Sequence, residues 1–196
     1  MAVPLRLNRA ATGTPAREAP RRIAVVRALF ALVWAAALVL AVGDKVPTAD
    51  SGVPIGAALL LASYPLIDLI SSLLSSTFGD AHVLRVNAAI DALAVLAVGA
   101  TAFGSDAGAT LATFGAWAIL SGAIQLALAI HRRRAAGRQL PMIVSGGLST
   151  VAGITFLAAA GMDEAKLTTL AGYMAVGALL YLLWARRSQP DPQAAR

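Results

Sequence analysis

Residues 111–134 read LATFGAWAILSGAIQLALAIHRRR, a predominantly apolar run of about twenty residues followed by one histidine and three arginines. Twenty helical residues are about 30 Å long, which is enough to cross the hydrocarbon layer of a bilayer. The basic residues that follow are typical of the cytoplasmic end of a membrane span. This stretch therefore predicts a transmembrane helix that ends on the cytoplasmic side.

Five more apolar stretches of similar length surround this one. They cover residues 23–42, 53–74, 83–103, 141–160 and 167–184. The whole chain of 196 residues is 58% hydrophobic and only 13% charged, whereas a soluble domain carries about 25% charged residues. We therefore expect an all-α polytopic membrane bundle of six helices over residues 23–187. A disordered basic cytoplasmic arm over residues 1–22 and a cytoplasmic tail over residues 188–196 would flank it.

The distribution of charge predicts the orientation of the bundle. All 14 arginines fall on the side of the N-terminus, whereas Lys45 and Lys166 fall in the loops on the other side. Because cytoplasmic loops are enriched in basic residues, both termini are expected inside the cell. The net charge of +6 is spread between the apolar runs, which favours a bilayer with an anionic inner leaflet as the partner and argues against nucleic acid.

The N-terminal segment allows a second interpretation. Residues 1–43 could form a cleaved signal peptide, because Ala41, Val42 and Gly43 make a small-x-small cleavage site. The apolar run is longer than that of most signal peptides, and five remaining helices would spoil the charge asymmetry. A retained first span is the expectation.

The chain also shows a weak internal repeat. Superposing Pro65, Gly122 and Gly177 aligns the second, fourth and sixth spans at offsets of 57 and 55 residues. The repeating unit would be a helical hairpin of about 56 residues that occurs three times in the same orientation.

Two acidic residues lie inside predicted spans and are the candidates for proton or ion handling. Asp68 and Asp91 each lie about 10–12 Å from the cytoplasmic end of their helices, so adjacent antiparallel helices would bring them to one level. Asn87, Gln125 and Tyr64 are polar neighbours at matching positions. Such residues face the bundle interior and mark either a proton pathway or a structural polar cluster that determines helix register. Two carboxylates at close range would share a proton.

Small residues suggest where helices pack closely. Ser145, Ser149 and Gly153 follow one another at four-residue spacing, and Gly122 is similarly placed in the fourth span. Small side chains allow close backbone approach in lipid. We expect packing within the chain here, with a homo-oligomer interface as the alternative.

The remaining polar residues give no sign of an enzyme. The chain has no cysteine and no motif typical of a phosphate-binding loop, a serine nucleophile or a zinc protease. Arg132, Arg133 and Arg134 are interpreted as lipid-facing basic residues at the cytoplasmic surface. We therefore expect no catalytic residues, no metal and no cofactor.

From about residue 56 to residue 187 the chain resembles the HdeD-like family of small six-helix bacterial membrane proteins, also described as short-repeat membrane proteins of unknown function. The segments GAWAILSGAIQLALAIHRRR, IVSGGLSTVAGITFLAAAG and LAGYMAVGALLYLLWARR carry this resemblance. It implies a multi-pass protein of the bacterial inner (plasma) membrane with a role in acid resistance or another envelope stress response. A small proton-coupled transporter or channel that uses Asp68 and Asp91 is the alternative, and an assembly subunit is a third.

Overall fold

The computed structural model describes residues 14–43, 47–136 and 139–188, with no side chains described for residues 14–17 and 134–136. Six α-helices account for most of them: α1 (Thr14–Val42), α2 (Ile55–Ser75), α3 (Ala81–Gly104), α4 (Ala107–Ala136), α5 (Leu140–Ala159) and α6 (Thr168–Arg187). A short 3-10 helix, η1 (Ser76–Phe78), follows α2. All six α-helices are long and apolar enough to cross a membrane. The predicted all-α bundle of six spans is confirmed, and the chain is a multi-pass membrane protein.

The helices extend beyond the apolar runs at two places. α1 begins at Thr14, so residues 14–22, which were expected to be disordered, are helical, while residues 1–13 lie outside the described residues. α4 continues through the arginines to Ala136. Arginine, glutamate and alanine all favour helix, and hydropathy marks the membrane-buried part of a helix and not its end. Ser188 ends the described C-terminal segment, so most of the predicted tail lies outside it.

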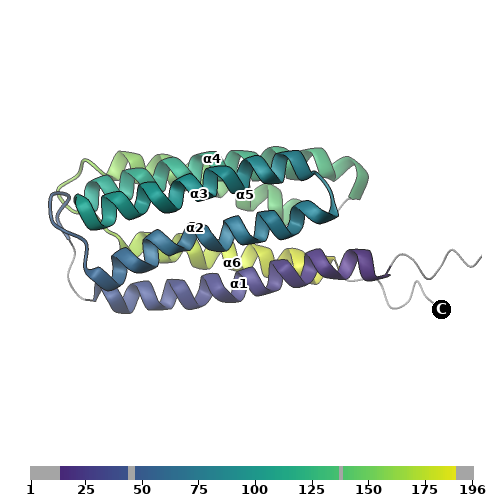
Figure 1. The fold of residues 1–196 in the computed structure, drawn as a ribbon, viewed down its shortest axis with the longest axis horizontal. Helices are drawn as coiled ribbons and strands as arrows, with labels where there is room; N and C mark the ends of the chain where they lie inside the picture. The colour runs from purple at the N-terminus through teal and green to yellow at the C-terminus, as the bar shows by residue number, and fades with distance from the viewer. Residues whose placement is uncertain (1–13, 44–46, 137–138, 189–196) are drawn as a thin grey trace, which may run out of the picture.

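The six helices form a closed ring. Each helix packs on its neighbours along the chain, and α6 also packs on α1 (Figure 1). α1 begins and α6 ends at the same end of the bundle, where the described arginines gather. We call this the basic end, and we call the other end, which holds the α1–α2 and α5–α6 loops, the opposite end.

The opposite end is filled and closed. Large hydrophobic side chains there that are at most 1% exposed come from five helices and the last loop: Leu38, Leu61, Val98, Leu111, Phe114, Leu167, Leu170 and Met174. The loops above them are joined by backbone hydrogen bonds, from Ala49 N to Asp163 O at 3.2 Å and from Gly108 N to Ala49 O at 2.8 Å. The core of the protein therefore lies toward this end of the ring.

Glycines bring the backbones of α4 and α5 into contact. A Cβ atom placed on Gly153 would lie 2.5 Å from the carbonyl oxygen of Gly115, and one placed on Gly122 would lie 2.7 Å from Cβ of Ser149. Ser149 donates a hydrogen bond to the carbonyl oxygen of Ala118 at 3.1 Å. The small residues at these positions therefore face one another within the chain. Such close approach stabilises helix pairs in lipid through van der Waals contact.

Candidate functional site

A buried ion pair between α1 and α2 lies inside the ring. The guanidinium Nη1 of Arg27 pairs with Oδ1 of Asp68, and Ser121 on α4 donates a hydrogen bond to Oδ2 of Asp68 at 2.9 Å. The Arg27 guanidinium carbon also lies 4.2 Å from the centre of the Tyr181 ring on α6. Four helices therefore contribute to this ion pair or contact it. The pairing and the additional contacts offset the free-energy cost of placing two charges at membrane depth.

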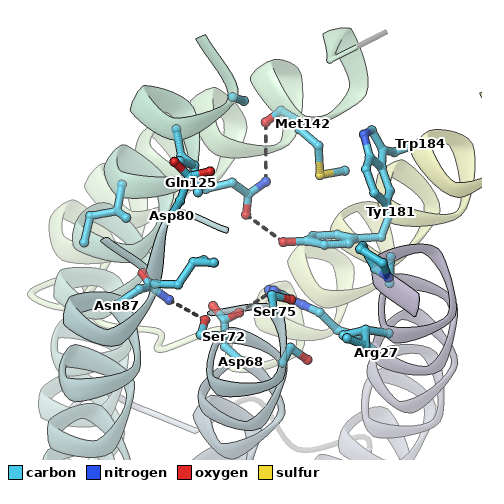
Figure 2. A pocket seen from close by; sticks show the side chains of 18 of the residues that line it. Arg27, Asp68, Ser72, Ser75, Asp80, Asn87, Gln125, Met142, Tyr181 and Trp184 are labelled. Atoms are coloured by element: carbon cyan, nitrogen blue, oxygen red, sulfur yellow. Dashed lines mark hydrogen bonds and ion pairs between the residues drawn. The ribbon is translucent and has the colours of Figure 1, made fainter. Parts of the chain in front are cut away.

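Asp91 on α3 is completely buried and has only neutral partners. Asn87, one turn earlier, donates to Oδ2 of Asp91 at 2.8 Å, and the indole Nε1 of Trp117 donates to Oδ1 at 2.8 Å. Asn87 also donates to Ser72 on α2 at 3.1 Å, as Figure 2 shows. Each carboxylate thus has its own set of donors, and among the described residues no hydrogen bond joins Asp68 to Asp91. That they titrate as a coupled pair stays a prediction.

The other two predicted polar neighbours have hydrogen-bond and ring partners other than the two carboxylates. Gln125 donates from Nε2 to the carbonyl oxygen of Met142 at 3.4 Å and accepts a hydrogen bond from Tyr181 at 3.1 Å (Figure 2). Tyr64 stacks on Phe114 with ring centres 5.9 Å apart. Gln125 therefore connects α4, α5 and α6, while Tyr64 belongs to the aromatic core between the charges and the opposite end.

Three members of the site were missed by the sequence analysis. Arg27 was counted only among the 14 arginines of the cytoplasmic side, although it lies four residues inside the first apolar run. Arg85 at the start of α3 is exposed, and Arg27 is the arginine that pairs with Asp68. Trp117 and Ser121, which donate hydrogen bonds to Asp91 and Asp68, were not among the predicted site residues. An arginine inside an apolar run was the one available signal, because a charge at that depth needs a partner.

The arginines at the end of α4 have different surroundings. Nε of Arg132 pairs with Oδ2 of Asp80 in the α2–α3 turn at 2.7 Å, so this arginine has a protein partner, and its lipid-facing position stays a prediction. Asp80 has a left-handed backbone, with φ of 49°, and makes no side-chain cap on α3. Its carboxylate is therefore free to reach across to α4. Arg133 is exposed, and the side chain of Arg134 lies outside the described residues.

Two cavities meet at the ion pair. The first, of about 360 Å³, occupies the ring interior at the basic end and is the one drawn in Figure 2. The second, of about 330 Å³, lies between α5 and α6. Five residues line both cavities: Arg27, Asp68, Ser121, Gln125 and Tyr181. The charged site therefore lies where a vestibule at the basic end meets a side chamber between α5 and α6.

The described residues include no group of three or more His, Asp or Glu side chains placed to hold a metal ion. His82 and His131 are both exposed and do not line either cavity. What the site offers chemically is therefore a guanidinium, two carboxylates, and hydroxyl, amide and indole donors.

Comparison with known protein families gives a match, which lies in the central part of the chain. A family described as a short repeat of unknown function, DUF308, matches residues 92–158. Residues 92–158 are therefore similar to this short repeat. The match covers about the second half of α3, all of α4 and all but the last residue of α5, and it confirms the resemblance to the HdeD-like proteins, which belong to the same family. It includes Trp117 and Ser121 but not Arg27, Asp68 or Asp91. No curated protein and no solved structure gave a significant match.

Proposed function

We propose that this membrane protein takes up and releases a proton at the cluster of Arg27, Asp68 and Asp91 and so supports survival under acid or envelope stress. The observation that carries the proposal is the charge balance of the cluster. Two buried carboxylates share the bundle interior with the guanidinium of Arg27, which pairs with Asp68, and the donors to Asp91 are neutral. An unbalanced charge at this depth is costly, and one proton removes it.

The vestibule supplies a route for that proton. Ser71, Ser72, Ser75 and Asn87 line it together with Asp68, so hydroxyl and amide groups extend from the basic end toward the ion pair. A cavity of this size with these polar groups on its wall can hold water molecules that have several polar partners each. Protons would therefore exchange with the compartment at the basic end, which the positive-inside rule assigns to the cytoplasm of a bacterial cell, with the protein in its inner membrane.

Because the opposite end is closed, we favour a protein that senses or buffers protons and not one that forms an open channel. The aromatic rings of Tyr64, Phe114 and Trp117 lie between the charges and the closing loops. A small proton-coupled transporter is the second candidate, and the observation in its favour is the side chamber that reaches the same ion pair. Transport would require the loops of the opposite end to separate. No catalytic step and no cofactor form part of either proposal.

Acid survival of a deletion strain carrying single variants tests the proposal. We expect Asp68→Asn and Asp91→Asn each to abolish the protection given by the wild-type protein, with membrane levels equal by immunoblot. Asp50→Asn, an exposed acid at the opposite end, is the matched control and should protect fully. Because Asp68→Asn leaves Arg27 unpaired, the double variant Arg27→Gln/Asp68→Asn should be tested beside it. Full protection by Asp91→Asn would refute a proton-handling role.

Proteoliposomes separate the two candidate functions. Purified protein in vesicles with an internal pH dye should bind protons without dissipating an imposed pH gradient if it senses or buffers. If the pH gradient collapses with the wild type but not with Asp91→Asn, the protein moves protons across the membrane, and the transporter hypothesis is favoured.

A further inference from the structure

The side chamber opens laterally between α5 and α6, toward the surface that faces lipid. Its rim is formed by Leu148, Val151 and Val176, which are 48%, 57% and 46% exposed. These side chains continue the apolar outer surface of the bundle into the cavity wall. A molecule could therefore enter from the hydrocarbon layer without crossing a polar barrier.

The inner end of the same chamber is polar, and most of its polar groups already have partners. Ser121 donates to Asp68, Tyr181 donates to Gln125, and Ser149 and Tyr173 share a hydrogen bond at 2.7 Å. The side chain of Arg27 is different, because it is 19% exposed to the cavities. A guanidinium carries five N–H donors, and among the described residues Asp68 is its only carboxylate partner.

An apolar lateral entrance that leads to a guanidinium suits one kind of ligand. A hydrocarbon chain fits the rim and walls, and an anionic oxygen is the acceptor that a guanidinium binds best. The volume of about 330 Å³ is near the lower limit of small-molecule sites, which favours one chain over two. We propose that the chamber between α5 and α6 binds a single-chain amphiphile with its anionic head group, a carboxylate or a phosphate, at Arg27.

Asp68 limits this binding because it competes for the same guanidinium. Neutralising Asp68 should therefore strengthen the binding of an anionic head group, whereas neutralising both members of the pair should remove it. This dependence on charge distinguishes the proposal from simple partition of a chain into an apolar groove. The site shares Arg27 and Asp68 with the proposed proton site, but the binding requires no proton transfer.

A glycine on α6 offers a way to fill the chamber without disturbing the fold. Gly177 lines it, and a Cβ atom placed there would have no atom within 4 Å. A leucine side chain at this position would occupy the space that we assign to the hydrocarbon chain of the ligand. Gly147 on α5 has equally open surroundings but does not line the chamber, so Gly147→Leu is the matched control.

Photolabelling of the full chain in nanodiscs tests the proposal. Four probes with the same photoreactive alkyl chain would carry a carboxylate, a phosphate, an alcohol or a quaternary ammonium head group, and labelled peptides would be mapped by mass spectrometry. We expect the anionic probes to label the segments around Val151 and Val176 preferentially, and their relative strength identifies the head group. Stronger or equal labelling by the alcohol or ammonium probe, or labelling spread over all six helices, would overturn the proposal.

Variants of the protein, labelled with the same probes, test the proposal independently. Gly177→Leu should reduce labelling by the anionic probe about tenfold while Gly147→Leu leaves it unchanged. Loss of a charged hydrogen bond predicts a drop of about tenfold or more for Arg27→Gln/Asp68→Asn, and Asp68→Asn alone should increase labelling. Equal labelling of the wild type and the double variant, with equal thermal stability, would refute the role of Arg27. A failure here leaves the acid-survival result of Asp91→Asn untouched, so the two proposals can fail separately.

Discussion

Replacing Gly153 by alanine should destabilise the bundle, because this glycine lies where α5 touches the backbone of α4. The added Cβ would lie 2.5 Å from the carbonyl oxygen of Gly115 and 2.8 Å from the amide nitrogen of Ile119. Ordinary contacts of a Cβ are about 3.4 Å or longer, so α4 and α5 would have to separate by nearly 1 Å. Backbone atoms cannot rotate away as a side chain can, and the whole interface between the two helices would loosen.

The size of the effect follows from two opposing contributions. Forcing an extra methyl group into a well-packed interface costs about 1–3 kcal/mol, while alanine favours helix over glycine by up to about 1 kcal/mol. Gly147→Ala on the same helix gains the second contribution without the first, because its Cβ would have nothing within 4 Å. The difference between the two variants therefore isolates the cost of the clash, about 1–3 kcal/mol.

Thermal unfolding of both variants in one detergent, followed by circular dichroism, measures this difference. For a chain of this length each kcal/mol corresponds to roughly 2–4 °C in Tm, so Gly153→Ala should melt several degrees below Gly147→Ala. Equal Tm values would mean that α4 and α5 are not in backbone contact, and the packing argument would be refuted.

Three further outcomes are expected. Since the chain has no cysteine, single cysteines at Asp106 and Arg133 should react with an impermeant thiol reagent from opposite sides of the membrane, and labelling of both from outside would contradict the topology. Trp117→Phe removes a donor to the buried carboxylate of α3 and should cost about 1–3 kcal/mol in the free energy of unfolding, whereas Trp184→Phe should be neutral because its indole nitrogen has no hydrogen-bond partner among the described residues. Asp80→Asn breaks a half-exposed ion pair and should cost at most about 1 kcal/mol, less at high salt; a larger loss of Tm would show that this pair holds the turn in place.

The spans could be predicted from the sequence because they depend on a local property. Inside a bilayer every backbone group must find its partner within the helix or barrel that crosses it, so a sufficiently long apolar run is helical whatever its neighbours. All six runs became helices with bounds close to those expected, such as residues 83–103 against Ala81–Gly104. The bounds differ most where charged residues flank a run, before Ile23 and after Ile130. Hydropathy does not indicate where a helix ends at such places.

The site itself could be predicted only in part. Asp68, Asp91 and Asn87 were recognisable because a polar group at membrane depth is costly wherever it lies, and the spacing of Asn87 from Asp91 is one helical turn. Which cation balances Asp68 was decided by tertiary structure, since Arg27 lies 41 positions away and reaches it only because α1 packs beside α2 in the closed ring.

The positions of the cavities also depend on how the six helices pack in the ring. Glycines bring α4 and α5 together, yet Gly177 on α6 faces a chamber, and nothing in the residue type distinguishes the two outcomes. A cavity is the volume that six helices together fail to fill, and it depends on the angle and distance of every pair. The sequence by itself determined that the chain crosses the membrane six times with two carboxylates inside. The tertiary structure alone decided that one of them, Asp68, meets an arginine at the junction of two cavities, because that meeting depends on contacts between helices and not on any one of them.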